Sequence, residues 1–273
     1  MRRHSKRSTR QDKNRLLGWV YGGIGVVIIC GIITAAVLLN LHRKETDPVT
    51  GCPKDGYESI TSVLVDLTDP INPVQEAALQ NALLKVRDEV PKYGRLEIYP
   101  LKPTITTAIE PLFFGCSPGS GRDEDNGFYG NPELANRRWK RMFADKVDAV
   151  INELQKLPPQ QNSPLLEGLQ SVAVTSLGSP LAANASTKRI LLLSDMIHHT
   201  PELSMYKGAP DFVQFKSTQY YPRIKPTLRG AQVDVFLIVR DTQKHVQQPP
   251  LYKFWVEFMN ASGGFLQNWE PLQ

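Results

Sequence analysis

The sequence predicts an α/β domain with a mostly parallel β-sheet flanked by helices, preceded by one transmembrane helix. Three observations lead to this prediction. Apolar runs of strand length alternate with helical patterns after residue 59, which is typical of parallel sheets. Residues 16–41 contain no charged side chain, and two of the apolar runs end in an aspartate. A chain of 273 residues has room for one such domain and a short appendage.

The N-terminal appendage is predicted to be a membrane anchor. A spanning helix needs about 20 apolar residues, and the uncharged stretch 16–41 is longer. A cleavable signal peptide would have an apolar core of only about 7 to 15 residues, and no small-residue cleavage site follows this one. Residues 1–15 carry seven basic side chains and one acidic one, so the positive-inside rule predicts a cytoplasmic tail. The C-terminal domain is then exported, and we favour a bacterial inner membrane with a periplasmic domain.

Charge and cysteine content describe the exported part further. The formal net charge is +5, but residues 1–15 contribute +6, which leaves −1 for the remainder. This near-neutral balance gives no support for nucleic-acid binding. Cys30 lies in the predicted span, whereas Cys52 and Cys116 would meet an oxidising compartment. These two cysteines either form a disulfide or stay as two buried thiols.

The exported part opens with a connector and the first elements of the sheet. Pro and Gly residues in 42–58 are typical of a linker, so the domain is expected to cover 59–273. The apolar run 62–66 predicts the first strand. Apolar residues at helical spacing predict a helix over 73–90, and alternation over 95–101 predicts the second strand.

The middle of the chain is predicted to hold a long loop, two helices and a buried strand. Repeated Gly and Pro residues indicate a loop over 103–132. Helical periodicity follows over 133–157, and a further helix is expected over about 165–177. The near-continuous apolar run 188–194 indicates a strand covered on both faces.

The last part completes the sheet. Four prolines make 198–230 irregular, and the apolar run 232–239 predicts another strand. A helix is expected over 251–261, followed by a Gly-Gly turn and an edge strand over 265–269.

Oxygen-bearing side chains follow two of these strands. Asp66 and Thr68 come at the end of the first strand, and Asp195 comes at the end of the strand 188–194. Open α/β sheets bind their ligands outside the carboxyl ends of the strands. If the two strands are neighbours, these oxygens meet at one edge and suit a hard cation such as Mg²⁺.

The order of parts over 62–273 resembles a von Willebrand factor A (vWA) domain. That family has a Rossmann-like sheet, and its metal-ion-dependent adhesion site begins with Asp-x-Ser-x-Ser after the first strand. Asp66 stands at the position of the acid, and Thr68 stands at the first Ser. Pro70 stands at the second Ser and has no side-chain ligand, so the motif is degenerate.

Two later motifs extend this resemblance. Ser163 stands where the family has a Thr in the loop before a helix, and Asp195 stands at the acid after the fourth strand. Residues 254–264 are similar to the family's final helix and Gly-Gly turn. The resemblance implies a Mg²⁺, Mn²⁺ or Ca²⁺ ion held directly or through water by Asp66, Thr68, Ser163 and Asp195. A partner's carboxylate would complete the coordination.

Other interpretations of these residues stay open. Asp66 and Asp195 can instead accept backbone N–H bonds and only cap the following loops. His198 and His199 lie near the same edge, but adjacent histidines point apart in an extended chain and lack further ligand spacing. The charged stretch 122–125 lacks the fuller pattern of a calcium loop.

These features predict a single-pass membrane-anchored vWA-like module that binds a protein partner in an envelope assembly through a divalent cation. The alternative is a metal-free scaffold subunit of a membrane complex. We expect no enzyme activity and no small-molecule substrate, because motifs for covalent catalysis and phosphate binding are missing from the sequence. A phosphoesterase of the haloacid dehalogenase type would need a second acid where Thr68 stands.

Overall fold

A computed structural model describes residues 8–41, 44–105, 108–124 and 130–272. The chain divides into two compact units, Met1–Glu45 and Thr46–Gln273, and each is described by itself. Residues 1–7 of the predicted basic tail lie outside the described residues, as does Asp125 at the end of the charged stretch 122–125.

The first unit contains helix α1, Ser8–Leu41. Its segment Gly18–Ala35 has a mean hydropathy of 1.9 and is long and apolar enough to cross a membrane. None of that segment is buried against other described residues, and Trp19 is 83% exposed. The helix begins before the uncharged stretch 16–41, and the crossing of a membrane stays a prediction.

The second unit is built on a sheet that confirms the predicted α/β fold class. In the described part of the chain, six strands follow the order β3-β2-β1-β4-β5-β6. The pairs are parallel except for β2 with β3. Because the strand order reverses at β1 and β4, this is a doubly wound sheet. The strands are β1 Ser59–Val65, β2 Arg95–Pro100, β3 Phe113–Cys116, β4 Thr187–Ser194, β5 Gln232–Leu237 and β6 Phe265–Pro271.

Helices connect the strands and cover both faces. The predicted helix 133–157 is formed by two α-helices with a π-helical turn at Lys140–Ala144 between them. The predicted helix 165–177 ends in a second π-helical turn, Ala173–Leu177. The α-helices of this unit are α2 Pro73–Glu89, α3 Pro132–Trp139, α4 Asp145–Leu154, α5 Leu165–Val172, α6 Phe212–Lys216, α7 Tyr221–Ile224 and α8 Pro249–Ala261.

Short polar side chains explain where several helices begin. The Asn72 side chain accepts a hydrogen bond from the Gln75 N–H, and Gln75 returns the bond, which is a capping box before α2. Asn131 and Asp211 cap α3 and α6 with one side-chain oxygen that accepts backbone N–H bonds, without the returning bond of a capping box. Prolines occupy the first turn of α2 and α3, where their missing N–H costs no helical bond.

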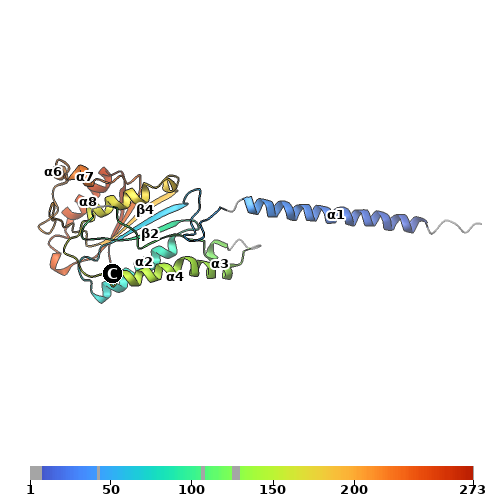
Figure 1. Cartoon of the computed structure of the whole chain (residues 1–273), viewed down its shortest axis with the longest axis horizontal. Coiled ribbons are helices and arrows are strands. Elements are labelled where there is room, and N and C mark those ends of the chain that lie inside the picture. Colours follow the sequence, from blue (N-terminus) through green and yellow to red (C-terminus); the bar gives the residue numbers. More distant parts are fainter. Residues whose placement is uncertain (1–7, 42–43, 106–107, 125–129, 273) are drawn as a thin grey trace, which may run out of the picture. The chain divides into compact units, whose positions relative to one another are not determined.

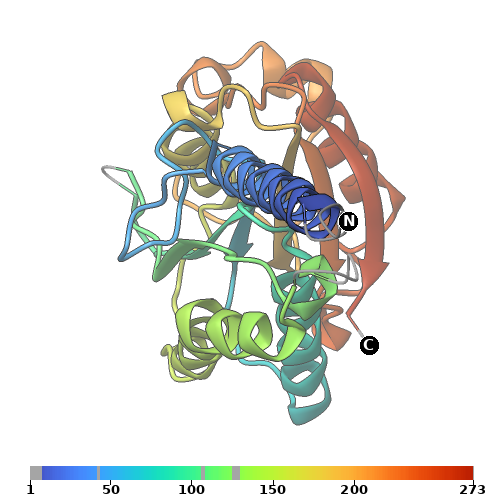
Figure 2. The same ribbon diagram turned by 90° about the vertical axis from the view of Figure 1, so that its right-hand side faces the viewer.

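Alternation along the strands divides the hydrophobic core into two clusters. In β1, Ile60 and Leu64 face the side covered by α5 and α8, whereas Val63 and Val65 face α2 and α4. Figure 1 shows α8 and α2 on opposite sides of the sheet, and Figure 2 shows the curved strands between the two layers. A sheet covered on both faces has apolar strands with no polar face, as the sequence of β4 indicates.

A disulfide joins Cys52 to Cys116, which confirms this alternative over two free thiols. Next to it, the Cys116 N–H donates to the Thr50 carbonyl at 2.8 Å. Gly51 has φ +71°, and a Cβ there would lie 3.0 Å from the Cys116 carbonyl oxygen, so only glycine fits without strain. From Thr46 onward, the segment expected to be a linker is therefore part of the second unit.

Strand β3 and the helices α6 and α7 were not predicted. Strand β3 lies inside the segment 103–132, which we expected to be a loop throughout. The two helices lie in the segment 198–230, which we expected to be irregular. Each of these elements has five residues or fewer, which is too short for a periodic pattern.

Candidate functional site

The two acid-terminated strands are neighbours. β1 and β4 pair in parallel, with Val65 opposite Leu193, and the Asp66 N–H donates to the Leu193 carbonyl at 2.8 Å. Asp66 and Asp195 therefore emerge at the same edge, where the strand order reverses. Ligands of open α/β sheets bind at this switch point.

Asp66 is the centre of a network of hydroxyl groups. Its side chain is buried, and its Oδ1 accepts bonds from the Thr68 N–H at 3.1 Å and the Thr68 hydroxyl at 2.8 Å. Its Oδ2 accepts bonds from Ser163 at 2.9 Å and Ser194 at 2.8 Å. Four donors from three chain segments thus surround one carboxylate, and such bonds to a charged acceptor are the stronger kind.

The loop before α5 brings Ser163 to this network. The Ser163 N–H donates to the His199 carbonyl and the His199 N–H donates to the Ser163 carbonyl, both at 2.9 Å. This two-bond bridge fixes the loop beside the chain that follows β4. Thr68, from the same predicted motif as Asp66, and Ser163, from a separate one, thus both donate to the Asp66 carboxylate.

Asp195 is held beside them by other contacts. Its Oδ1 accepts the Ile197 N–H at 2.9 Å, and its Oδ2 accepts the Arg240 Nε–H at 3.3 Å. Burial, and then the negative charge of Asp66, raise the pKa of the Asp195 carboxyl far above its usual range. Both effects disfavour the charged form of the Asp195 carboxyl.

The residue after Asp195 has an unusual backbone conformation. Met196 has φ +63°, a left-handed conformation that favours glycine. The Met196 N–H donates to the Ser194 hydroxyl at 2.8 Å, and its carbonyl accepts the Trp255 indole N–H at 2.9 Å. These two bonds hold the turn that aims Asp195 at the site.

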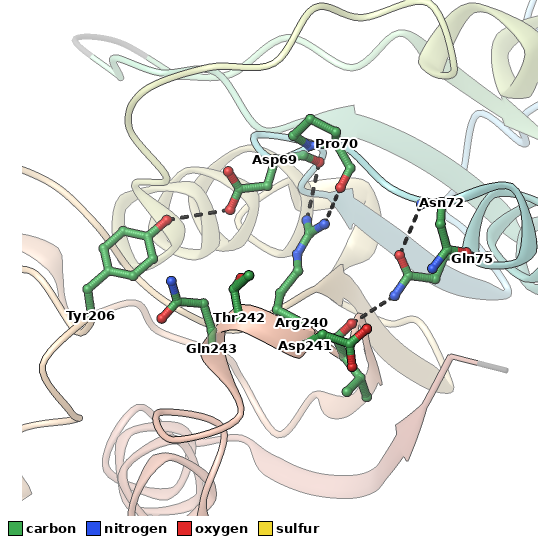
Figure 3. A pocket seen from close by; sticks show the side chains of 10 residues that line it. Asp69, Pro70, Asn72, Gln75, Tyr206, Arg240, Asp241, Thr242 and Gln243 are labelled. Atoms are coloured by element: carbon green, nitrogen blue, oxygen red, sulfur yellow. Dashed lines mark hydrogen bonds between the residues drawn. The ribbon is translucent and has the colours of Figure 1, made fainter.

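Arg240 also belongs to the site, although the sequence did not predict it. It lies three residues after β5, and its guanidinium donates to Asp195 and to the carbonyl oxygens of Asp69, at 3.2 Å, and Pro70. Figure 3 shows this side chain extended between the two loops. The Gln247 side chain accepts the Arg240 N–H at 2.8 Å and donates to the Asp195 carbonyl at 3.0 Å. The available signal was the position of Arg240 just after a predicted strand at the same edge.

A polar pocket of about 410 Å³ borders the site. Its walls come from the loop after β1, including Asp69 and Asn72, and from the loop after β5, including Arg240 and Gln243. Tyr206 donates to the Asp69 carboxylate at 3.4 Å. Burial and the nearby acids, Asp69 first, raise the pKa of Tyr206 to about 12. The carboxylates of Asp69, Asp195 and Asp66 thus add negative charge around the Tyr206 hydroxyl.

The donor set fits a hard divalent cation. Asp66 and Asp195 offer carboxylate oxygens, and Thr68, Ser163 and Ser194 offer hydroxyl oxygens, which Mg²⁺ and Ca²⁺ both prefer. The described residues contain no group of three or more His, Cys, Asp or Glu placed to hold a metal. The candidate site therefore holds two acids, and its other oxygen atoms come from hydroxyl groups.

The other metal sites considered from the sequence are not assembled. His198 is buried with its Nε2 3.2 Å from the Tyr220 hydroxyl, whereas the His199 Nδ1 is 2.9 Å from the Ser204 hydroxyl. The two rings therefore serve different networks. In the described part of the stretch 122–125, Asp123 accepts hydrogen bonds from the Ser120 N–H and hydroxyl, which is a local turn.

The chain resembles known proteins at the level of structure and not at the level of sequence. No protein-family model matches the chain, and no curated protein sequence matches it. Among solved structures, the SpRpn10 VWA domain is similar at 11% identity and a TM-score of 0.41, covering 78% of this chain and 88% of that one.

Two further solved structures are similar over less of their own length. The PilB minor pilin from Streptococcus sanguinis has 11% identity and a TM-score of 0.44, covering 81% of this chain and 59% of that one. A von Willebrand factor type A structure from Catenulispora acidiphila has 10% identity and a TM-score of 0.38, with coverages of 78% and 39%. Identities this low carry no functional information.

Proposed function

We propose that this chain is a membrane-anchored protein-binding module of the vWA type, which docks its partner through a divalent cation. The observation that carries this proposal is the gathering of Asp66, Thr68, Ser163 and Asp195 at the switch point of the sheet. Three separate motifs contribute to one buried site, and local loop capping alone does not require that convergence.

Asp66, Thr68, Ser163 and Asp195 would hold the ion, with Ser194 orienting the Asp66 carboxylate. A bound Mg²⁺, Mn²⁺ or Ca²⁺ would offer positive charge and an open coordination position to a partner's carboxylate. The closeness of the two acids, Asp66 and Asp195, supports this assignment, because a cation would relieve the repulsion between them.

The anchor and the disulfide support an exported location. Helix α1 is long and apolar enough to span a bilayer, and the basic residues before its uncharged stretch favour a cytoplasmic N-terminus. The Cys52–Cys116 disulfide is typical of an oxidising compartment. We therefore propose that the domain acts outside the cytoplasm, in the periplasm if the host is a bacterium.

Titration calorimetry of the full chain in detergent, first freed of metal by a chelator, tests the cation site. We expect Mg²⁺ and Mn²⁺ to release or absorb heat with the wild type and neither ion to do so with Asp66→Ala. Asp195→Asn, which keeps the size of the side chain, serves as a second variant if Asp66→Ala does not fold. The matched control is Asp47→Ala, because Asp47 caps a distant turn at Thr50. Absence of heat with the wild type would contradict the cation.

The second candidate is a metal-free scaffold subunit that docks through the same fold. It is favoured by the four hydrogen bonds to Asp66, which already satisfy both carboxylate oxygens within the chain. Capture of partners with and without a chelator separates the two functions. A partner retained equally in both conditions would support the scaffold.

A further inference from the structure

We infer that Arg240 is a tethered cation that closes the acidic edge of the sheet in the metal-free protein and must withdraw from Asp195 when a divalent cation binds. This inference rests on the proposed cation site. It assigns the residue that limits the affinity of that site and the loop that responds when the site is filled.

The contacts of Asp195 carry the first step. One of its oxygens accepts the Ile197 backbone N–H, and the other accepts the Arg240 Nε–H. Each oxygen keeps a second lone pair that could ligate a cation, but a cation bound there would lie beside both donors, and the Arg240 guanidinium is the charged one. The Ile197 N–H is fixed by the chain that continues from β4, whereas Arg240 reaches Asp195 through a long side chain with several rotatable bonds. Arg240 is therefore the contact that gives way.

Charge repulsion carries the second step. A divalent ion and a guanidinium that share one buried carboxylate repel each other strongly, because little water screens them there. The Arg240 side chain is only 10% exposed, and Asp195 is 4% exposed. Arginine keeps its charge at every accessible pH, so it cannot escape the repulsion by losing a proton. It has to move.

The other contacts of Arg240 show what its movement would change. Its guanidinium also binds the carbonyl oxygens of Asp69 and Pro70, in the loop that carries Thr68. Its backbone N–H is bound by Gln247 at the far end of the same loop, 239–248. Withdrawal of Arg240 would therefore break these hydrogen bonds between the loop after β5 and the loop after β1. Both loops line the polar pocket in Figure 3, so filling the site would reshape the wall of that pocket.

Pro70 fits this arrangement. It occupies the position where the vWA motif has its second hydroxyl, and its carbonyl oxygen accepts a bond from Arg240. At this position the loop therefore has a backbone carbonyl that binds the guanidinium, but it has no side chain that could ligate a cation. The loss of one ligand and the gain of an internal cation act in the same direction, toward weaker metal binding.

The test compares three forms of the full chain in detergent after removal of metal: wild type, Arg240→Gln and Arg189→Gln. Arg189 is the matched control, because it also pairs with a buried acid, Asp234, but at the opposite end of β4. Mn²⁺ affinity is measured by calorimetry, and amide hydrogen exchange of the loop 239–248 is measured with and without saturating Mn²⁺.

Arg240→Gln is expected to bind Mn²⁺ about tenfold or more tightly than the wild type, because one competing charge is removed. Arg189→Gln is expected to match the wild-type affinity. In the wild type, Mn²⁺ should speed exchange in the loop 239–248. In Arg240→Gln the loop should exchange rapidly even without the ion. Arg240→Lys keeps the charge without the planar fork, and it should give an intermediate affinity if the Gln variant does not fold.

The outcomes separate this inference from the function on which it rests. If wild type and Arg240→Gln bind Mn²⁺ equally, Arg240 does not compete and the inference is overturned, while the cation site stands. If only Arg240→Gln binds, the inference is supported and the wild-type protein works without a metal. If no form binds Mn²⁺, both the cation site and the inference fail.

Discussion

Asp66 illustrates why a single residue could be recognised from the sequence while its neighbours could not. It ends an apolar strand, which is a local pattern, and it is joined by Ser163 from a loop far along the chain. Arg240 carries no such pattern, because a single arginine after a strand is usually solvated. Its role depends on which strands are neighbours, and only the folded sheet determines that.

A second residue, His198, is buried beside the site, and its pKa leads to a prediction of how stability depends on pH. Burial, and then the neighbouring His199, lower the pKa of His198 to about 3 from an ordinary value of 6.5. The unfolded chain therefore binds a proton more readily than the folded chain between these values. The stability that neutral His198 maintains is lost as the pH falls below about 6.5.

We expect the free energy of unfolding of the wild type to fall, relative to His198→Gln, by up to about 3 kcal/mol between pH 7 and pH 4. Urea unfolding at several pH values measures this difference. His245→Gln, which removes an exposed histidine, should follow the wild type at every pH. Parallel curves for wild type and His198→Gln would show that His198 does not titrate in this way.

At the scale of elements, the two hydrophobic periodicities predicted most of the fold. Period two and continuous apolar runs located the strands β1, β2, β4 and β5, and helical spacing located α2 and α4. Strand β3 was not predicted because it has only four residues, two of which are Gly115 and Cys116, and it lies within a segment rich in turn residues. Its pairing depends on partners outside itself, namely Arg95 to Ile98 in β2 and the disulfide.

The disulfide is expected to stabilise this edge of the sheet. It links residues separated by 64 positions, so the double variant Cys52→Ser/Cys116→Ser should unfold at a free energy lower by about 2–4 kcal/mol. Segment 46–53 should then separate from β3, and trypsin should cleave faster at Lys54. Denaturant unfolding and timed proteolysis measure both effects.

Two comparisons control for the chemistry of the thiols. Cys30→Ser should leave stability unchanged, because Cys30 is a free thiol in α1. The wild type treated with a reductant should behave like the double variant. Equal stability of the oxidised wild type and the double variant would contradict a stabilising role for the bridge.

At the scale of the whole molecule, the proposed function depends on the side of the membrane that the second unit occupies. Charge asymmetry across α1 predicts export, since residues 1–15 hold seven basic side chains and one acid. Alkaline phosphatase folds only outside the cytoplasm of a bacterium. Alkaline phosphatase fused after Gln273 should therefore be active. A fluorescent protein that folds only in the cytoplasm, fused at the same position, should give no fluorescence.

The asymmetry itself can be removed to show that it acts. Replacing all seven basic residues of 1–15 by Gln should lower the phosphatase activity severalfold, because the positive-inside bias is lost. A control replaces four basic residues beyond α1, namely Arg137, Arg138, Lys140 and Arg141. The control should keep full phosphatase activity, because charges this far from the span contribute little to orientation. An inactive wild-type fusion would place the acidic edge in the cytoplasm, and the docking partner proposed for it would then have to be cytoplasmic as well.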